Sequence, residues 1–192
     1  GGCSKPKGTL PFVQALPIVL DKKPDTCFLI AGPKPLIMSK TTSDRLLRRL
    51  LLIDEYEHKV IQAATEFISA GHLRFLGVRR DVPQLIAATD IIVFPSTVPH
   101  FARPVIEASA MAKPVIASDI GGPQELVVPD ETGLLIPPDN PEQLATAIVS
   151  LLDDSEMMTQ MGEKGYQRAT NKFDSKVNSE RTYAVYDELL LT

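Results

Sequence analysis

Cysteine, histidine and tryptophan are scarce in this sequence of 192 residues, which contains two cysteines, three histidines and no tryptophan. The two cysteines, Cys3 and Cys27, make no metal-ligand spacing with each other or with the scattered histidines. We therefore expect no metal site and no disulfide framework, and a reduced, cytoplasmic setting.

Long apolar runs and an excess of basic residues are also lacking. No run approaches the roughly 20 residues of a membrane-spanning helix, and no signal peptide opens the chain, so we expect no transmembrane segment. A net charge of −4 leaves no basic face for a phosphate backbone, so we expect no nucleic-acid partner. The hydrophobic content of 44% is enough for one buried core, and the length does not require two domains.

Strand-like and helix-like apolar patterns alternate along the chain. Short apolar runs predict strands at residues 26–31, 73–76, 91–94 and 114–118, with a closing strand before residue 137. Helical periodicity predicts helices near residues 10–20, 43–51, 60–68, 82–88, 103–111, 141–152, 155–170 and 174–190. Such alternation favours an α/β fold with a Rossmann-like, doubly wound parallel sheet, here one domain over residues 1–192.

Local signals refine these helices. Pro17 is expected to break or bend the first helix, and Asp81 is expected to cap the short helix at residues 82–88. Pro141, which follows Asn140, is expected in the first turn of a later helix. Leu46, Leu47, Leu50 and Leu51 form one apolar stripe, with Ser43 or Asp44 as its cap. Residues 34–42 are the one plausible mobile loop.

Residues 95–136 contain the strongest functional signal. Glu107 lies in the first turns of a predicted helix that follows a strand, where the acid could bind ribose hydroxyls while N–H groups bind phosphate. Lys7 stands before Gly8 at the start of the first helix, where an ammonium group suits a diphosphate. Each residue has a plainer alternative. Glu107 could be a solvated acid on a helix, and Lys7 could be an ordinary surface lysine.

Two further residues in this region have open alternatives. Arg103 is either a surface residue at a helix start or a phosphate clamp. His100 either binds the donor, through a sugar hydroxyl or the diphosphate, or braces its own loop through a backbone carbonyl. Pro114 to Ser118 lead into Gly121 and Gly122, a glycine pair that predicts a tight turn at the end of a strand.

This order of motifs resembles the nucleotide-sugar-binding, C-terminal half of retaining glycosyltransferases of the GT-B fold, in particular family 4. The matching residues are Pro95, Ser96, Phe101, Glu107, Ala108, Ala110, Lys113, Pro114, Val115, Ala117, Ser118, Gly121, Gly122 and Glu125, followed by residues 130–135. Upstream, the Pro6, Lys7 and Gly8 run, residues 75–77, and Asp81 with Val82 also stand where that family has them.

The resemblance implies the donor-binding domain of a hexosyltransferase. Such an enzyme moves a sugar from a nucleoside diphosphate to an acceptor hydroxyl. Lys7, Arg103 and N–H groups from Ala102 to Val105 would stabilise the leaving diphosphate without metal or cofactor. Phe101 would line the site, and Val78 and Arg79 would read the base. A half of a nucleotide-sugar epimerase or a sugar-phosphate synthase, and a non-catalytic nucleotide-binding module, remain the alternatives.

The resemblance also implies a partner. The N-terminal acceptor domain and the expected first strand are absent from this chain, so we expect the isolated chain to be inactive. The final helix, with Tyr183, Tyr186 and Leu189, would lean toward that domain, and its uncovered face would favour self-association. Membrane-peripheral association would come through the missing domain.

Three positions depart from the family pattern. Pro99 stands where an acid is usual, Ala102 replaces a glycine, and Cys3 replaces an arginine. Proline cannot hydrogen-bond a sugar as an acid does, so His100 is the natural substitute in this loop. Pro104 also removes one N–H from the helix start.

Overall fold

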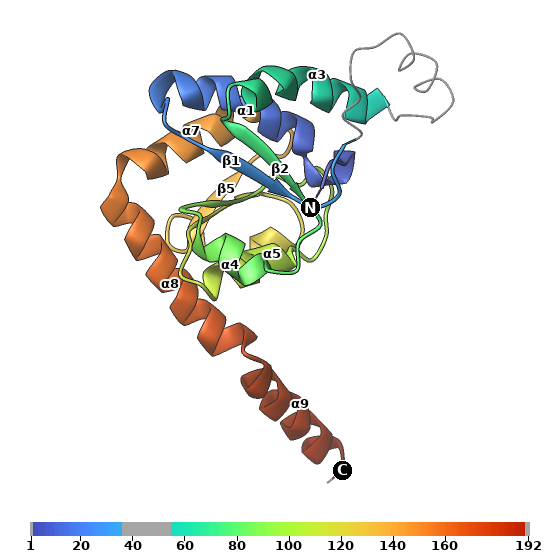
Figure 1. Ribbon diagram of the computed structural model, residues 1–192. Helices are drawn as coiled ribbons and strands as arrows, with labels where there is room; N and C mark the ends of the chain where they lie inside the picture. Colours follow the sequence, from blue (N-terminus) through green and yellow to red (C-terminus); the bar gives the residue numbers. More distant parts are fainter. Residues whose placement is uncertain (1, 36–54, 191–192) are drawn as a thin grey trace.

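Short parallel strands form the centre of the protein. The structure is a computed structural model that describes residues 2–35 and 55–190. Its strands are β1 (Phe28–Ala31), β2 (Leu73–Gly77), β3 (Ile92–Phe94), β4 (Val115–Ser118) and β5 (Gly133–Ile136). Every pairing among them is parallel, so the predicted α/β class with parallel strands is confirmed (Figure 1).

The strands form two sheets in the described residues, whereas the sequence predicted one. β1 pairs with β2, and β3, β4 and β5 pair in that order. β1 and β3 are therefore the edges of two separate sheets. Strand pairing depends on what lies alongside in space, which a hydrophobic pattern along the chain does not report.

Helices cover the strands on two sides. The short turn η1 (Lys5–Lys7) leads into α1 (Thr9–Lys22), and the later helices are α3 (Glu55–Ser69), α4 (Val82–Ala87), α5 (Arg103–Ser109), α6 (Gly122–Leu126), α7 (Pro141–Asp153), α8 (Ser155–Phe173) and α9 (Ser175–Leu190). α1, α3 and α7 lie on one side, and α4 and α5 on the other (Figure 1). The predicted stripe from Leu46 to Leu51, its cap, and residues 36–42 of the predicted mobile loop lie outside the described residues.

The main core lies between α1, α7 and the strands. Leu16 of α1, Leu144 and Leu151 of α7, Leu73 of β2 and Ile116 of β4 are all almost fully buried in it. Burying side chains of this size stabilises a fold by about 1.5 to 3 kcal/mol each before the entropy cost is counted. A smaller cluster includes Phe94 of β3, Val105 of α5 and Ala117 of β4.

Three local predictions have different outcomes. Pro141 stands in the first turn of α7 as expected, and Asn140 caps this helix, because its side chain accepts a hydrogen bond from the Gln143 N–H at 2.9 Å. Asp81 precedes α4 but makes no side-chain cap bond, so that prediction is wrong; its carboxylate binds Arg79 instead. Pro17 does not end α1, which continues through it to Lys22 with the proline on the exposed side.

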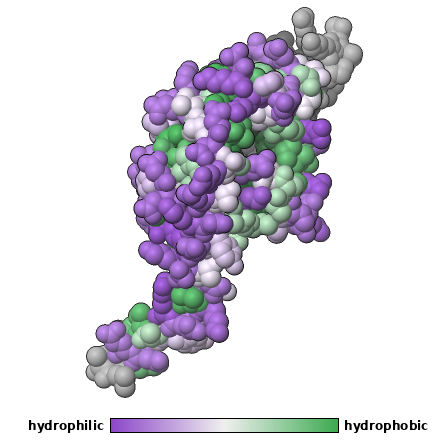
Figure 2. Space-filling view, turned by 90° about the vertical axis from the view of Figure 1, so that its left-hand side faces the viewer, coloured by the Kyte–Doolittle hydropathy of each residue, from purple (hydrophilic) through white to green (hydrophobic). Residues whose placement is uncertain are grey.

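The C-terminal helix α9 projects away from the strands (Figure 1). No residue of α9 is buried, and Tyr183, Tyr186, Leu189 and Leu190 are all more than half exposed. Figure 2 shows apolar side chains on this projecting segment among polar ones. A partner domain at this face and self-association through it both stay predictions.

Helix α8 approaches the rest of the protein closely at one glycine. A Cβ on Gly162 would lie 2.1 Å from the carbonyl oxygen of Ala112, in the turn after α5. A Cβ on Gly165, one turn further on, would meet the Ser109 side chain at an ordinary 3.5 Å. The two glycines share a helix and burial but differ in the space around them.

This difference predicts opposite effects of adding one methyl group. Gly162→Ala should lower the free energy of unfolding by about 1 to 3 kcal/mol, because the helix must move away from a rigid backbone. Gly165→Ala, the matched control, should leave it unchanged or raise it by up to about 1 kcal/mol through helix propensity. Urea denaturation of both variants measures the free energy of unfolding. Equal effects of the two substitutions would show that the contact between Gly162 and Ala112 does not fix the position of α8.

Candidate functional site

The loops that follow β2, β3 and β4 gather at one edge, with η1 beside them. The carboxyl ends of parallel strands meet at the same edge of a sheet, where ligands of α/β proteins bind. η1 contributes Lys7, the β3 loop contributes residues 95–102, and the β4 loop contributes Gly121 and Gly122.

The β3 loop is fixed to η1 by hydrogen bonds between segments about 90 residues apart. The Thr97 N–H donates to the Pro6 carbonyl at 3.1 Å, and the Thr97 hydroxyl donates to the Lys5 carbonyl at 2.8 Å. The Ser96 hydroxyl, which is 1% exposed, lies 3.0 Å from the Pro6 carbonyl and 2.7 Å from the Val98 carbonyl. These bonds within the chain anchor the loop to η1.

His100 joins this loop directly to Lys7. Its Nε2 lies 2.9 Å from the Lys7 Nζ, while Nδ1 lies 3.0 Å from the Val98 carbonyl and 3.1 Å from the Ser96 hydroxyl. An ammonium group can only donate, so Nε2 accepts and Nδ1 carries the proton that it donates. His100 thus braces its loop and positions Lys7; to reach a ligand, Nε2 has to exchange Lys7 for that ligand.

Phe94 lies under this pair at the end of β3. The Lys7 Nζ is 5.9 Å from the centre of the Phe94 ring, and the His100 ring centre is 5.2 Å from it. A ring face attracts a cation, so Phe94 helps to hold the ammonium at the edge. In the part of the chain that is described, Lys7 makes no ion pair with a carboxylate.

Two glycines allow the segments to approach this closely. Gly8 adopts φ 65°, and a Cβ there would lie 1.7 Å from the Pro95 carbonyl oxygen. A Cβ on Gly122 would lie 2.6 Å from the His100 carbonyl oxygen, which accepts the Gly122 N–H at 3.2 Å. The predicted tight turn at this glycine pair is thus also a contact with the His100 loop.

The start of α5 is built on a strained residue. Ala102, at the position where the resemblance implied a glycine, has a left-handed φ of 33° and is 2% exposed. The Val105 N–H donates to the Ala102 carbonyl at 2.9 Å, and Pro104 has no N–H. Of the N–H groups proposed for a diphosphate, Val105 is therefore already used, and its side chain is buried; those of Ala102 and Arg103 remain.

Arg103 and Glu107 pair with each other on α5. Arg103 Nε lies 3.1 Å from a Glu107 carboxylate oxygen, and the side chains are 80% and 37% exposed. Exposed pairs of this kind contribute at most about 1 kcal/mol, so a ligand can compete for both groups. Phe101, just before the helix, is largely exposed, as the sequence-predicted ligand role requires of it.

Val78 and Arg79 follow β2 at the same edge. Val78 is 76% exposed, and Arg79 Nε donates to Asp81 at 2.8 Å. The hydrogen bond from Arg79 lowers the pKa of the Asp81 carboxyl below its ordinary value. Among the described residues, no hydrogen bond or ion pair connects these two residues to Lys7, His100, Arg103 or Glu107.

Sequence reasoning missed two residues of this site. Ser96 was noted only as part of the matching motif, with no role of its own, and Phe94 only as part of a strand. The position of Ser96 in a Pro-Ser pair after an apolar run was a usable signal, because a small hydroxyl there can bond loop carbonyls. The partner of Phe94, by contrast, lies in η1 and has no local signal.

Metal and membrane features can be stated for the described ranges. In residues 2–35 and 55–190, no three histidine, cysteine or acidic side chains are grouped so that they could hold a metal ion. None of the helices in these ranges combines the length and apolar character that crossing a membrane requires.

Parallel strands with helices on both sides define the class as an α/β domain, and the anchored, cationic carboxyl edge is its candidate ligand site. The chain belongs to the family Glycosyl transferases group 1, which matches residues 2–168. The lipopolysaccharide core biosynthesis mannosyltransferase LpsB of Rhizobium meliloti is 27% identical over 186 residues, 96% of this chain and 49% of that protein. A glycogen synthase of Mycobacterium tuberculosis is 31% identical over 180 residues, 94% of this chain and 39% of the synthase.

Solved structures agree with this family. The Anabaena protein Alr3699/HepE in complex with UDP superimposes with a TM-score of 0.79 at 25% identity, over 97% of this chain and 47% of that one. The C-terminal domain of a glycosyl transferase group 1 family protein (LpcC) from Francisella tularensis gives 0.71 at 30%, over 91% and 84%. The chain therefore spans about half the length, or less, of the curated relatives it matches.

The Ser96 hydroxyl predicts a measurable contribution to stability. Ser96→Ala should lower the free energy of unfolding by about 1 to 3 kcal/mol, since it leaves buried polar groups unpaired. Thr97→Val is the matched control, because its hydroxyl bond is exposed and water can replace it; about 0.5 kcal/mol or less is expected. Denaturant titration compares them, and a Ser96 effect no larger than the control would remove Ser96 as the anchor.

Proposed function

We propose that this chain is the nucleotide-sugar donor domain of a retaining, family 4 hexosyltransferase of the GT-B fold. The observation that carries the proposal is the Lys7 ammonium, held by His100 and Phe94 at the carboxyl edge. Family membership and a UDP complex of a structural neighbour support it. The donor would be a nucleoside diphosphate sugar and the acceptor a hydroxyl.

The chemistry assigned to the cations is electrostatic. When the sugar leaves, negative charge gathers on the diphosphate, and fixed positive groups stabilise it more than they stabilise the substrate. Lys7 is held in place, whereas Arg103 is free to swing from Glu107 toward a phosphate. In this scheme Lys7 and Arg103 stabilise the charge of the diphosphate, so the scheme requires no metal ion.

Glu107 would bind the ribose hydroxyls. Its carboxylate lies one helical turn after Arg103, and ribose and diphosphate are likewise adjacent in a nucleotide. The Arg103–Glu107 pair keeps both side chains on one face until a ligand takes each partner. Val78 and Arg79 would contact the base, largely through backbone groups, from the loop after β2.

His100 would meet the diphosphate or the donor sugar by exchanging partners. Its Nε2 accepts a hydrogen bond from Lys7 at 2.9 Å, and a phosphate that drew Lys7 away would free that nitrogen. Pro99 supports this assignment. The resemblance implied an acid at this position, and the side chain of a proline cannot accept a hydrogen bond from a sugar hydroxyl as an acid does. Phe101 and Ala102 would line the same subsite.

The complete reaction would need a second domain. The relatives are about twice as long as this chain or longer, which supports an N-terminal acceptor domain in the whole protein and an inactive isolated chain. A non-catalytic nucleotide-binding module is the second candidate, and Pro99 is the observation that favours it. The cytoplasmic setting, and any peripheral membrane association, stay predictions.

The phosphate part of the proposal predicts a preference among ligands. UDP should bind more tightly than uridine, and Lys7→Ala should lose about 1.5 to 3 kcal/mol of UDP affinity, the cost of a charged hydrogen bond. Lys5→Ala, in the same turn but fully on the exposed side, is the matched control and should change little. Calorimetric titration of the parent chain and both variants measures these affinities. Equal affinity of the parent chain for UDP and uridine would contradict the proposal.

The ribose part predicts a separate effect. Glu107→Gln should weaken UDP binding by about 1 to 3 kcal/mol without lowering the melting temperature by more than the loss of an exposed pair allows. Glu142→Gln, an exposed acid in the first turn of α7, controls for net charge. If both variants bind UDP like the parent chain, Glu107 is not a ligand.

A further inference from the structure

Helix α6 begins in contact with the loop that holds His100. A Cβ on Gly121 would lie 2.9 Å from the Pro99 Cα, and a Cβ on Gly122 would lie 2.6 Å from the His100 carbonyl oxygen. The Gly122 N–H donates to that same oxygen at 3.2 Å. Backbone packs directly on backbone here, so the start of α6 and the loop have to move together.

The other end of α6 is bound by one side chain of α8. Arg168 Nε donates to the Leu126 carbonyl at 3.1 Å, and Arg168 Nη2 donates to the Glu125 carbonyl at 2.7 Å. The last carbonyls of a helix lack partners within the helix, and a basic side chain can satisfy them. Because α6 has only five residues, this one arginine binds two of its five carbonyl groups.

The guanidinium of Arg168 is itself held in position. It lies 5.9 Å from the centre of the Phe173 ring, and an aromatic ring face attracts a cation. Phe173 packs in turn against the smaller core cluster, to which Leu126 belongs. Within residues 2–35 and 55–190, Arg168 forms no ion pair with a carboxylate, so its N–H groups are directed at the end of α6.

The groups proposed for the diphosphate tolerate little displacement. His100 Nε2 lies 2.9 Å from the Lys7 Nζ, and His100 Nδ1 lies 3.0 Å from the Val98 carbonyl. Hydrogen bonds of this kind are lost beyond about 3.5 Å, and a binding site has to be held within about 0.5 Å of its productive geometry. A movement of the loop backbone by about 1 Å would therefore separate His100 from Lys7.

We propose that Arg168 is a positioning residue of the donor site, which acts through α6 on His100 and Lys7. Arg168 holds the carboxyl end of α6 against α8, and the amino end of α6 then fixes the His100 loop. Arg168 itself touches no ligand. The ligand part of this inference rests on the proposed function, whereas the effect on His100 does not require a ligand.

A purely structural role is the alternative. Arg168 would then only fasten α6 to α8, and its loss would lower the melting temperature without changing the surroundings of His100. The close contact between Gly162 and the Ala112 carbonyl also fixes α8, independently of Arg168. We therefore expect the fold to survive a substitution of Arg168.

NMR spectroscopy of the ligand-free chain gives the first measurement, with His100→Gln to assign the ring signals. Arg168→Met removes both bonds to α6 and keeps an apolar stem. The His100 ring nitrogens should change their signals, and the Nδ1 proton should exchange with water at least about tenfold faster. Arg181→Met is the matched control, because Arg181 of α9 also donates to a backbone carbonyl, that of Asn171 at 3.3 Å. Its His100 signals should equal those of the parent chain.

Calorimetric titration gives the second measurement. Arg168→Met should weaken UDP binding by about 5- to 20-fold, since displacing the groups that contact a ligand costs affinity on this scale. Uridine binding should change by less than about twofold, because uridine has no diphosphate for Lys7 and His100 to contact. Arg168→Lys keeps the charge but lacks the planar pair of donors, so it should recover only part of the lost UDP affinity.

The two measurements separate the possible outcomes. Unchanged His100 signals in Arg168→Met, or equal effects of Arg168→Met and Arg181→Met, would overturn the proposal and leave a purely structural role. Changed signals with an unchanged ratio of UDP to uridine affinity would overturn the part that concerns the donor. If the parent chain binds UDP no better than uridine, the proposed function fails, and the His100 signals alone decide the role of Arg168. If Arg168→Met does not fold, Arg168→Lys is held to the same comparisons.

Discussion

The contact between Gly8 and Pro95 is the constraint on which the rest of the site depends. Only a residue without a side chain lets the start of α1 sit against the end of β3, where a Cβ would lie 1.7 Å from the Pro95 oxygen. That approach brings η1 within hydrogen-bond distance of Ser96 and Thr97. Lys7 consequently reaches His100 and Phe94, although more than 85 residues separate them in the chain.

Much of the fold follows from local patterns in the sequence. Each strand and helix that was predicted within the described residues overlaps an observed one, because apolar runs and helical stripes encode which surface is buried. The failures have specific physical causes. Asp81 binds a cation two residues earlier instead of capping α4, and Pro17 is tolerated because its side of α1 faces solvent. The division into two sheets could not be predicted, because it depends on which strands lie together in space.

The candidate site was predictable in its residue types and less so in its pairings. Lys7, His100, Arg103 and Glu107 were selected because their chemistry suits a nucleotide at a sheet edge. The structure shows them bonded to one another, Lys7 to His100 and Arg103 to Glu107. The pairing of Lys7 with His100 depends on segments that the fold brings together, which the residue types alone do not report. Ser96 was missed because its hydroxyl acts on Pro6, far away in sequence.

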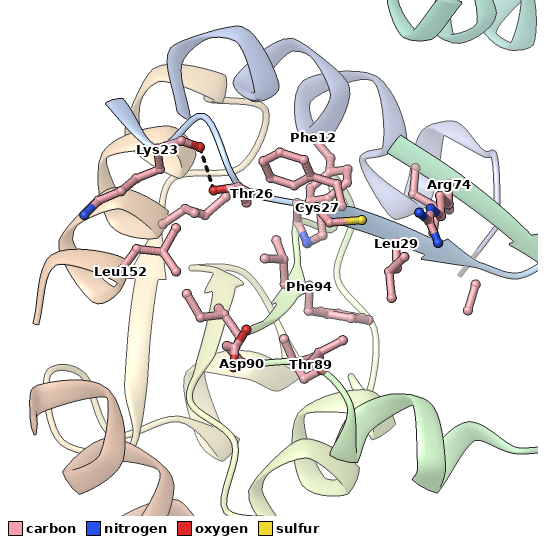
Figure 3. Close-up of a pocket in the computed structure, with 18 of the residues that line it drawn as sticks. Phe12, Lys23, Thr26, Cys27, Leu29, Arg74, Thr89, Asp90, Phe94 and Leu152 are labelled. Atoms are coloured by element: carbon pink, nitrogen blue, oxygen red, sulfur yellow. Dashed lines mark hydrogen bonds between the residues drawn. The ribbon is translucent and has the colours of Figure 1, made fainter. Parts of the chain in front are cut away.

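The cavity between β1 and β3 (Figure 3) meets the candidate site at the edge where η1 lies. Gly2 and Lys7 both line this cavity, and Gly2 is fixed by hydrogen bonds to Ala31 of β1 and Thr9 of α1. These bonds hold the segment that leads into the turn of Lys7. A charged group stabilises a developing charge best when it is held in place beforehand. Fixing the start of the chain to β1 and α1 and positioning the Lys7 ammonium are in that sense a single structural requirement.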